Sequence, residues 1–152
     1  MSAIPYAPKT LTMMDRQGNL HLLMLDETTI RVYDTSMALK DSTELRLEPV
    51  PTTVAERDTV IARRNPSMSS LISANFPSHK TLIEYFFVDE EGRYWINTND
   101  SPKYAVLDAD GNPLGSFDLP DGLTLLHVAQ NRLYLTDFTN EQFSLEVYEA
   151  RW

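Results

Sequence analysis

The residues of this chain that could hold a metal ion are aspartates placed at turns. Asp15 and Asp89 each stand three residues before a glycine, and either carboxylate could bind Ca²⁺ through oxygen. The ordinary use of an aspartate at such a turn is to accept the turn's own amides, and we favour this interpretation. The segment from Asp108 to Asn112 is similar to the start of a calcium loop, but Leu119 stands where that loop needs a glutamate. The sequence therefore predicts no metal site and no cofactor.

Side chains suited to acid–base or nucleophilic catalysis are few. His21, His79 and His127 have no spacing that would let two of them bind one metal ion. His21 alternates with apolar neighbours, so we expect it at the surface of a strand. The chain has no cysteine, no Gly-x-Ser-x-Gly motif and no glycine-rich phosphate loop. We therefore assign no catalytic residue.

The composition narrows the classes of partner. Lys and Arg number 13 against 22 Asp and Glu, which gives a formal net charge of −9. This balance repels phosphate backbones and anionic lipid surfaces, so neither nucleic acid nor a membrane is expected as a partner. The first ten residues lack the basic and apolar regions of a secretory signal. We expect a soluble chain of unknown compartment, periplasmic or extracellular if it is a fragment of an exported protein.

The elements that position these residues are set by an internal repeat. Asp15 and Gly18 recur as Asp89 and Gly92, at a spacing of 74 residues. The same spacing joins Val32 to Val106, Asp34 to Asp108, and Leu45 to Leu119. A third, weaker copy begins at Val128, where the segment 132–135 matches 93–96 at a spacing of 39. The unit is thus about 40 residues long, and the longer spacing contains an insertion of roughly 34.

Each unit is predicted to consist of short strands between turns rich in Gly, Pro and Asp. Four antiparallel strands in about 40 residues are typical of a propeller blade. The fold class is therefore all-β, with about three four-stranded antiparallel propeller-type blades and one inserted helix. A two-sheet β-sandwich is the alternative, and the regular repeat argues against it. The expected strands are 10–14, 19–25, 29–33 and 44–47, then 83–89, 93–98, 104–107 and 114–119, and finally 123–129, 132–136 and 144–149.

The domain organisation follows from these strands. We predict a partial β-propeller over 1–152, made of a blade at 10–48, a helix and loop insertion at 49–81, a blade at 82–120 and a blade at 121–152. In the insertion, Thr53 and Glu56 have the spacing of a capping box, and Pro66 would end the helix. The segment 53–65 is therefore predicted to be a surface helix.

Three polar residues fall in the first strand of their blades, which in a propeller lines the central channel. They are Thr12, Glu84 and His127. A polar residue in such a strand is more often a solvated wall than a binding group. We nevertheless consider these three the candidate binding residues of the chain.

The segment 82–152 resembles the C-terminal blades of bacterial six-bladed β-propeller proteins of the NHL/TolB-like kind. The resemblance is carried by the runs 88–96, 106–111 and 114–120, by the closing segments 131–134 and 147–149, and by the helix insertion followed by Phe76-Pro77. These motifs describe turns and core positions. A six-bladed protein of this kind is roughly twice as long and usually begins with an export signal.

Two functions remain open at this point. The first is a non-catalytic binding or assembly module, which forms a homo-oligomer, such as a dimer completing a ring, or belongs to a longer propeller. The second is part of a six-bladed hydrolase or lactonase-like enzyme. The resemblance implies that such an enzyme holds a metal at the channel mouth, and only Glu84 and Asn131 could contribute here.

The third blade lacks an outer strand, and Ile4–Pro8 is the spare segment that could supply it.

Overall fold

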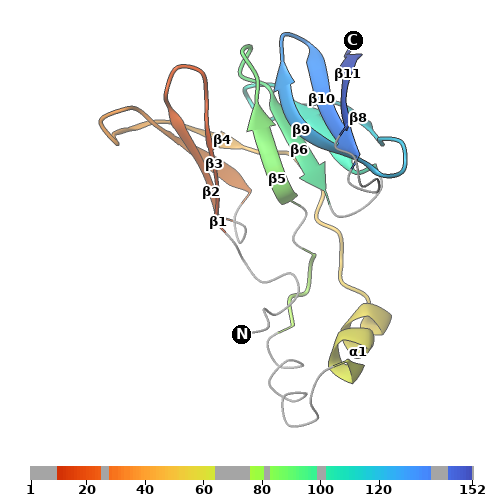
Figure 1. Ribbon diagram of the computed structural model, residues 1–152. Helices are drawn as coiled ribbons and strands as arrows, with labels where there is room; N and C mark the ends of the chain where they lie inside the picture. The colour runs from red at the N-terminus through yellow and green to blue at the C-terminus, as the bar shows by residue number, and fades with distance from the viewer. Residues whose placement is uncertain are drawn as a thin grey trace.

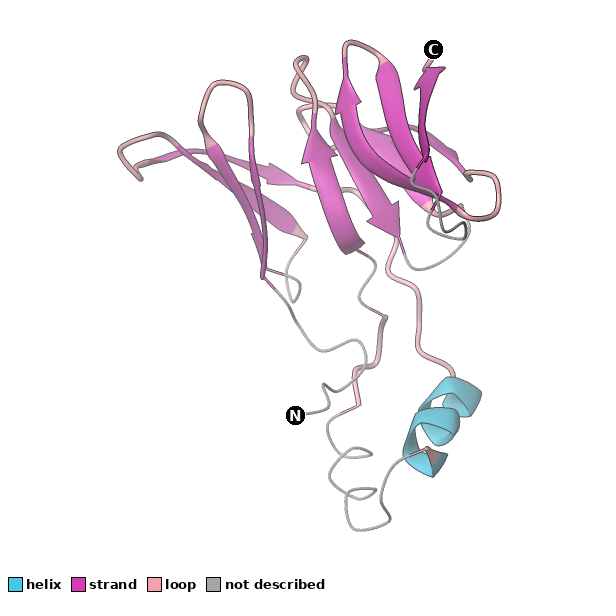
Figure 2. Cartoon of the chain, in the orientation of Figure 1, coloured by secondary structure: helices cyan, strands magenta, loops and turns pink. Residues whose placement is uncertain are grey.

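The computed structural model describes residues 10–24, 28–63, 76–80, 83–98, 102–137 and 144–151. Within these residues the chain forms three antiparallel sheets of four, four and three strands and one short helix (Figures 1 and 2). This confirms the all-β fold of propeller-type blades.

Blade 1 contains β1 (Thr10–Met14), β2 (Leu20–Met24), β3 (Thr29–Tyr33) and β4 (Leu39–Glu44). Blade 2 contains β5 (Ile83–Val88), β6 (Tyr94–Thr98), β7 (Tyr104–Leu107) and β8 (Pro113–Phe117). Blade 3 contains β9 (Leu123–Ala129), β10 (Arg132–Asp137) and β11 (Ser144–Glu149).

The strands of each blade pair in the order of the chain, and the first strands lie side by side. β1 contacts β5, and β5 contacts β9, so the three inner strands form one row (Figure 1). The sheets therefore fan outward from this row, as blades do around a propeller axis. The segment Ile4–Pro8 lies outside the described residues.

Blade 2 is buried on both faces because a blade packs on each side of it. Strand β6 shows this most clearly, since successive side chains of a strand point to opposite faces. Tyr94 and Ile96 face the core shared with blade 1, whereas Trp95 faces the core shared with blade 3. The first core also contains Leu23, Ile30, Phe86 and Leu107, and the second contains Val106, Leu125, Val128 and Leu135.

The fourth strand of blade 1 differs from the prediction. We expected it at 44–47, but β4 spans Leu39–Glu44. Leu45 is buried all the same, and its amide donates to the carbonyl of Thr28, while the amide of Arg46 donates to the carbonyl of Gly111 in blade 2. The pairing of β4 with the β3 side thus continues one residue past Glu44, to Leu45, and the chain then bonds to the neighbouring blade at Arg46.

The insertion after blade 1 forms a stem and a helix. The amide of Thr52 donates to Ser78 and that of Lys80 donates to Val50, so the two arms of the insertion pair. Helix α1 (Val54–Ala62) begins at the predicted capping box of Thr53 and Glu56, and none of its residues is buried. Figure 1 shows α1 apart from the three sheets, which confirms the predicted surface helix within 53–63. Residues 64 and 65 of the predicted segment lie outside the described residues. Among all the residues that the structure describes, no helix is long and apolar enough to cross a membrane.

Candidate functional site

Two aspartates organise the turns between the first and second strands of blades 1 and 2. Asp15 Oδ1 accepts the amides of Gln17 and Asn19, each at 2.8 Å. Asp89 Oδ1 accepts the amides of Glu91 at 2.9 Å and Arg93 at 3.0 Å. Both carboxylates therefore serve their own turns, as we predicted.

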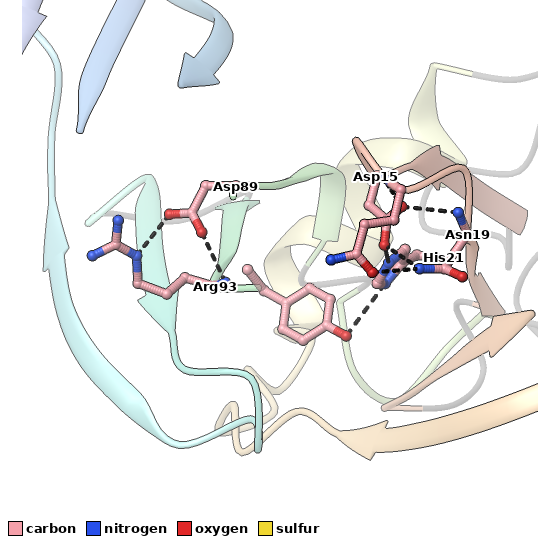
Figure 3. Close-up of polar contacts among 7 residues, drawn as sticks. Asp15, Asn19, His21, Asp89 and Arg93 are labelled. Atoms are coloured by element: carbon pink, nitrogen blue, oxygen red, sulfur yellow. Dashed lines mark hydrogen bonds and ion pairs between the residues drawn. The ribbon is translucent and has the colours of Figure 1, made fainter. Parts of the chain in front are cut away.

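The second oxygen of each aspartate binds one side chain just before the following strand and one within that strand (Figure 3). Asp15 Oδ2 lies 2.7 Å from Asn19 Nδ2 and 3.2 Å from His21 Nε2. Asp89 Oδ2 accepts hydrogen bonds from Arg93 Nε at 2.6 Å and Trp95 Nε1 at 2.9 Å. Burial pushes the pKa of Asp15 upward, but the hydrogen bonds from Asn19, His21 and Gln17 outweigh it and lower that pKa. These contacts leave little capacity for an external ligand.

The same two turns link neighbouring blades. His21 Nδ1 lies 3.3 Å from the Tyr94 hydroxyl of blade 2. Arg93 in turn donates to Asn131 Oδ1 of blade 3 at 2.6 Å. The expectation of a surface His21 is wrong, because the imidazole is buried between Asp15 and Tyr94. The alternation of residues along β2 shows that His21 lies on the same face as Leu23. It does not show that blade 2 covers this face.

A first recess lies at this end of the inner strands, and we call it the turn-end cavity. Its volume is about 330 Å³, and Met13, Met14, Asp15, Arg16, Val88, Asp89, Glu90, His127 and Val128 line it. His127 is exposed there, with its ring centroid 6.4 Å from that of Phe87 and 5.9 Å from that of Tyr134. Most of the polar side chains of this cavity already have partners. Glu90, for example, accepts the amide of Gln130 and pairs with Arg16.

A second recess lies where β5 and β9 begin, and we call it the Asn97 cavity. Its volume is about 270 Å³. It is open to solvent between blades 2 and 3. Its lining residues are Glu84, Tyr85, Asn97, Thr98, Lys103, Tyr104, Leu119, Pro120, Asp121, Gly122, Leu123 and Thr124.

Asn97 stands between two tyrosines on the face of blade 2 that meets blade 3. Tyr85, Asn97 and Tyr104 are directly opposite one another across β5, β6 and β7. The two phenol oxygens lie 3.0 Å apart, and they bind the backbone of Leu125, each at 3.4 Å. Burial, with the hydrogen bond to Tyr104, raises the pKa of Tyr85 far above its ordinary value. The Tyr85 phenol therefore stays protonated and is unsuited to proton transfer near neutral pH. Together with the Tyr104 hydroxyl, it joins blade 2 to the backbone of blade 3.

Asn97 Oδ1 is a buried oxygen beside this cavity that no donor of the described residues satisfies. The residue is only 6% exposed, and among the described residues this oxygen has no hydrogen-bond partner. A buried acceptor without a donor costs about 1–3 kcal/mol. Buried side-chain oxygens are nearly always satisfied in native proteins, so this oxygen is an exception among the described residues.

Comparison with blade 1 shows that these polar groups are particular to blade 2. The positions 74 residues before Tyr85, Asn97 and Tyr104 hold Leu11, Leu23 and Ile30. Leu23 and Ile30 are fully buried, and Leu11 packs against them. Three aliphatic side chains of one interface are thus replaced by a Tyr–Asn–Tyr row in the next. Our reading of the sequence missed this row, although a comparison of the two copies position by position would have revealed it.

The structure does not gather the predicted channel residues into one site. Thr12, Glu84 and His127 are exposed on the three inner strands β1, β5 and β9. Glu84 lines the Asn97 cavity and His127 lines the turn-end cavity, whereas Thr12 lines neither. Within the described residues no group of three or more His, Asp or Glu could hold a metal ion.

Comparisons with known proteins give a distant structural likeness. No family model and no curated protein matches the chain. A solved structure of streptogramin B lyase is similar, with 16% sequence identity and a TM-score of 0.40. The match covers 98% of this chain, and the chain spans only 42% of that structure. The likeness is thus no more than that of a distant propeller-type fold.

Proposed function

We propose that this chain is a non-catalytic binding or assembly module, and that two copies associate through their end blades to complete a ring of six. The observation that carries the proposal is the pair of apolar sheet faces on the outer sides of blades 1 and 3. Each core of the molecule is shared by two blades, so an end blade leaves one face without a neighbour. Soluble proteins seldom expose such faces without a partner.

The outer face of blade 1 presents an apolar row across all four strands. Residues paired in register share one face of a sheet, and Met14, Leu20, Tyr33 and Leu39 are paired in this way from β1 to β4. Met14 and Leu39, at the two ends of the row, are well exposed. Leu22 belongs to the next row on the same face.

The outer face of blade 3 is apolar in the same manner. His127, Tyr134 and Val147 form one row across β9, β10 and β11, and Leu145 pairs with Thr136 in the next row. Val147 and Leu145 are more than half exposed. The opposite face of this blade, with Leu125 and Leu135, is buried against blade 2. The exposed row therefore stands where a further blade would pack.

Burial of these apolar faces would favour association. Burying about 400 Å² of apolar surface at roughly 25 cal/mol per Å² contributes on the order of 10 kcal/mol, before the cost of association. Two copies related by a twofold axis would bring blade 1 of each against blade 3 of the other, which forms this contact twice. The closed assembly would then leave no blade face uncovered.

The enzymatic alternative has little support from the placement of its residues. Glu84 and Thr124 line the cavity at the start of β5 and β9, whereas Glu90 contacts Gln130 beyond the far ends of these strands. Asn131 follows Gln130 and is bound to Arg93. At about 3.3 Å per residue, six residues of strand separate the two positions by roughly 20 Å. Glu84 and Asn131 therefore cannot bind one metal ion.

Light scattering on the purified chain tests the assembly. We expect a dimer for the natural chain and a monomer for Val147→Glu, because a carboxylate on the outer face of blade 3 would be buried without a partner. The matched control is Val54→Glu on helix α1, where the side chain is 64% exposed, compared with 52% for Val147. A stable monomer of the natural chain across micromolar dilution, or equal masses for the two variants, would contradict the proposal. Aggregation without a defined dimer would favour the remainder of a longer propeller as the partner.

A further inference from the structure

We propose that Met37 anchors the contact between two copies of the chain, by filling the space that a fourth strand would occupy at the outer edge of the partner's blade 3. The inference rests on the proposed assembly and assigns to it a residue and a place. It begins from two unusual properties of Met37. Its backbone is left-handed, with a φ of 64°, and the residue is 64% exposed. A strained backbone that holds an apolar side chain in solvent gains nothing within its own blade, which points to a contact with another molecule.

The turn that carries Met37 has the same geometry as the turn of blade 2 that contacts blade 1. Met37 stands 74 residues before Gly111, and each donates its amide to the carbonyl of the aspartate three residues earlier. In both turns this aspartate also accepts, through Oδ1, the amides two and four residues after it. Relative to its blade, the side chain of Met37 therefore takes the direction that a Cβ atom would take at Gly111.

At Gly111 this direction leads into the outer strand of the preceding blade. A Cβ atom there would collide with the backbone carbonyl of Glu44, the last residue of β4. The corresponding turn of blade 1, between β3 and β4, lies on the side away from blade 2, where the preceding blade of a closed ring would stand (Figure 1). Met37 thus points toward the blade that the proposed assembly places there, which is blade 3 of the partner.

Blade 3 has the shape that this side chain requires. In the part of the chain that the structure describes, its sheet has three strands, and β11 is the outermost along the chain. A four-stranded blade would place its backbone against Met37, as β4 does against Gly111. In a three-stranded blade the nearest backbone lies further from the turn by one strand spacing, about 4.8 Å. A methionine side chain is flexible and apolar, so it suits a gap of this size.

The repeat also identifies the residue that Met37 meets. In blade 1, Thr43 of β4 would touch the added Cβ atom as well, and it pairs with Ile30 of β3. Strand β3 has the sequence Thr-Ile-Arg-Val-Tyr, and β11 begins Ser-Leu-Glu-Val-Tyr, so Leu145 holds the place of Ile30. Leu145 is an exposed apolar residue, at 54%. We therefore expect Met37 of one copy to lie against the partner's Leu145.

Association of the purified variants tests the role of the side chain. We expect Met37→Gly to weaken the dimer about 10- to 100-fold, because the burial of one methionine is lost. The fold should be kept, since the three related turns hold glycine at this place. Sedimentation equilibrium across micromolar dilution measures the association, and circular dichroism measures the fold. Met37→Leu retains an apolar side chain and should keep most of the affinity, whereas Leu114→Gly removes an exposed apolar side chain from blade 2 and should not weaken the dimer.

Chemical cross-linking tests the place of the contact, since the natural chain has no cysteine. We expect a mixture of Met37→Cys and Leu145→Cys chains to form a covalent dimer with a short reagent that joins two thiols. Neither variant should do so alone, because each junction of the ring brings one Met37 to one Leu145. A mixture of Val54→Cys and Leu145→Cys chains is the control, since Val54 lies on helix α1 and is equally exposed.

The outcomes separate this inference from the assembly on which it rests. A natural chain that stays monomeric would overturn both. A natural dimer that Met37→Gly does not weaken, or that gives no cross-link in the mixture of Met37→Cys and Leu145→Cys chains, would overturn the role of Met37 and leave the dimer standing. Cross-linking of Met37→Cys chains with one another would place blade 1 against blade 1 and contradict the contact with blade 3.

Discussion

Four turns in blades 1 and 2 begin with an aspartate and place the third residue after it in a left-handed conformation. Three of these positions hold glycine, and the fourth holds Met37, with a φ of 64°. In each turn the amide of this residue donates to the carbonyl of the aspartate, so the turns are built alike. A side chain at positive φ costs about 1–2 kcal/mol, which Met37 incurs without any compensating burial.

We expect Met37→Gly to raise the free energy of unfolding by about 0.5–1 kcal/mol, because relief of the left-handed conformation exceeds the extra chain entropy of glycine. Urea denaturation measures the change. The control is Leu114→Gly, an exposed apolar residue in strand β8, where glycine should instead destabilise the fold. A loss of stability in both variants would show that Met37 is not strained.

At the scale of elements, the described part of the insertion forms hydrogen bonds within itself. The backbone of its stem pairs between Val50–Thr52 and Ser78–Lys80, and the capping box closes the start of α1. One side chain joins the two features, since Lys80 Nζ lies 2.7 Å from Glu56 Oε1. This hydrogen bond, with those from the backbone and side chain of Thr53, lowers the pKa of Glu56 to about 2.

The stem and helix should therefore respond to acid. A carboxyl group with a lowered pKa in the folded state stabilises that state above its ordinary pKa of 4.5 and loses this effect as pH falls toward about 2. We expect the Glu56 side chain to titrate near pH 2 in nuclear magnetic resonance spectra, and to move toward 4.5 in Lys80→Met. A titration of Glu56 near 4.5 in the natural chain would contradict the bonded arrangement.

At the scale of the whole molecule, blades 1 and 2 approach each other closely at Gly111. Its carbonyl accepts the amide of Arg46, and the hydroxyl of Thr43 donates to the neighbouring carbonyl of Ala109 at 3.0 Å. A Cβ atom on Gly111 would collide with the backbone carbonyl of Glu44. The φ of Gly111 is also +81°, so two separate requirements exclude a side chain here.

We expect Gly111→Ala to lower the free energy of unfolding by about 3 kcal/mol, since left-handed strain and the clash between blades add. Gly115→Ala is the matched control, because a Cβ there meets nothing within 4 Å and alanine is no worse than glycine in a strand. Thermal and urea unfolding of both variants give the comparison. Similar stabilities would mean that the two blades can separate without cost.

Local patterns in the sequence were sufficient to predict most elements. Alternation gave the strands of blades 2 and 3 to within a residue or two, and aspartate and glycine marked the turns at Asp15 and Asp89. The capping box of Thr53 and Glu56 predicted the start of α1. These features depend on hydrogen bonds between residues a few positions apart, so the sequence determines them by itself.

Only the tertiary structure decided which faces are covered. His21 and Asn97 lie in similar alternating strands, yet blade 2 supplies His21 with the hydroxyl of Tyr94, while Asn97 Oδ1 meets no donor in the described chain. The same reason explains Leu45, which is buried just past the end of β4 because it belongs to the core that blade 1 shares with blade 2. Burial between blades depends on residues some 70 positions away in the case of His21 and Tyr94, so periodicity within one strand cannot reveal it.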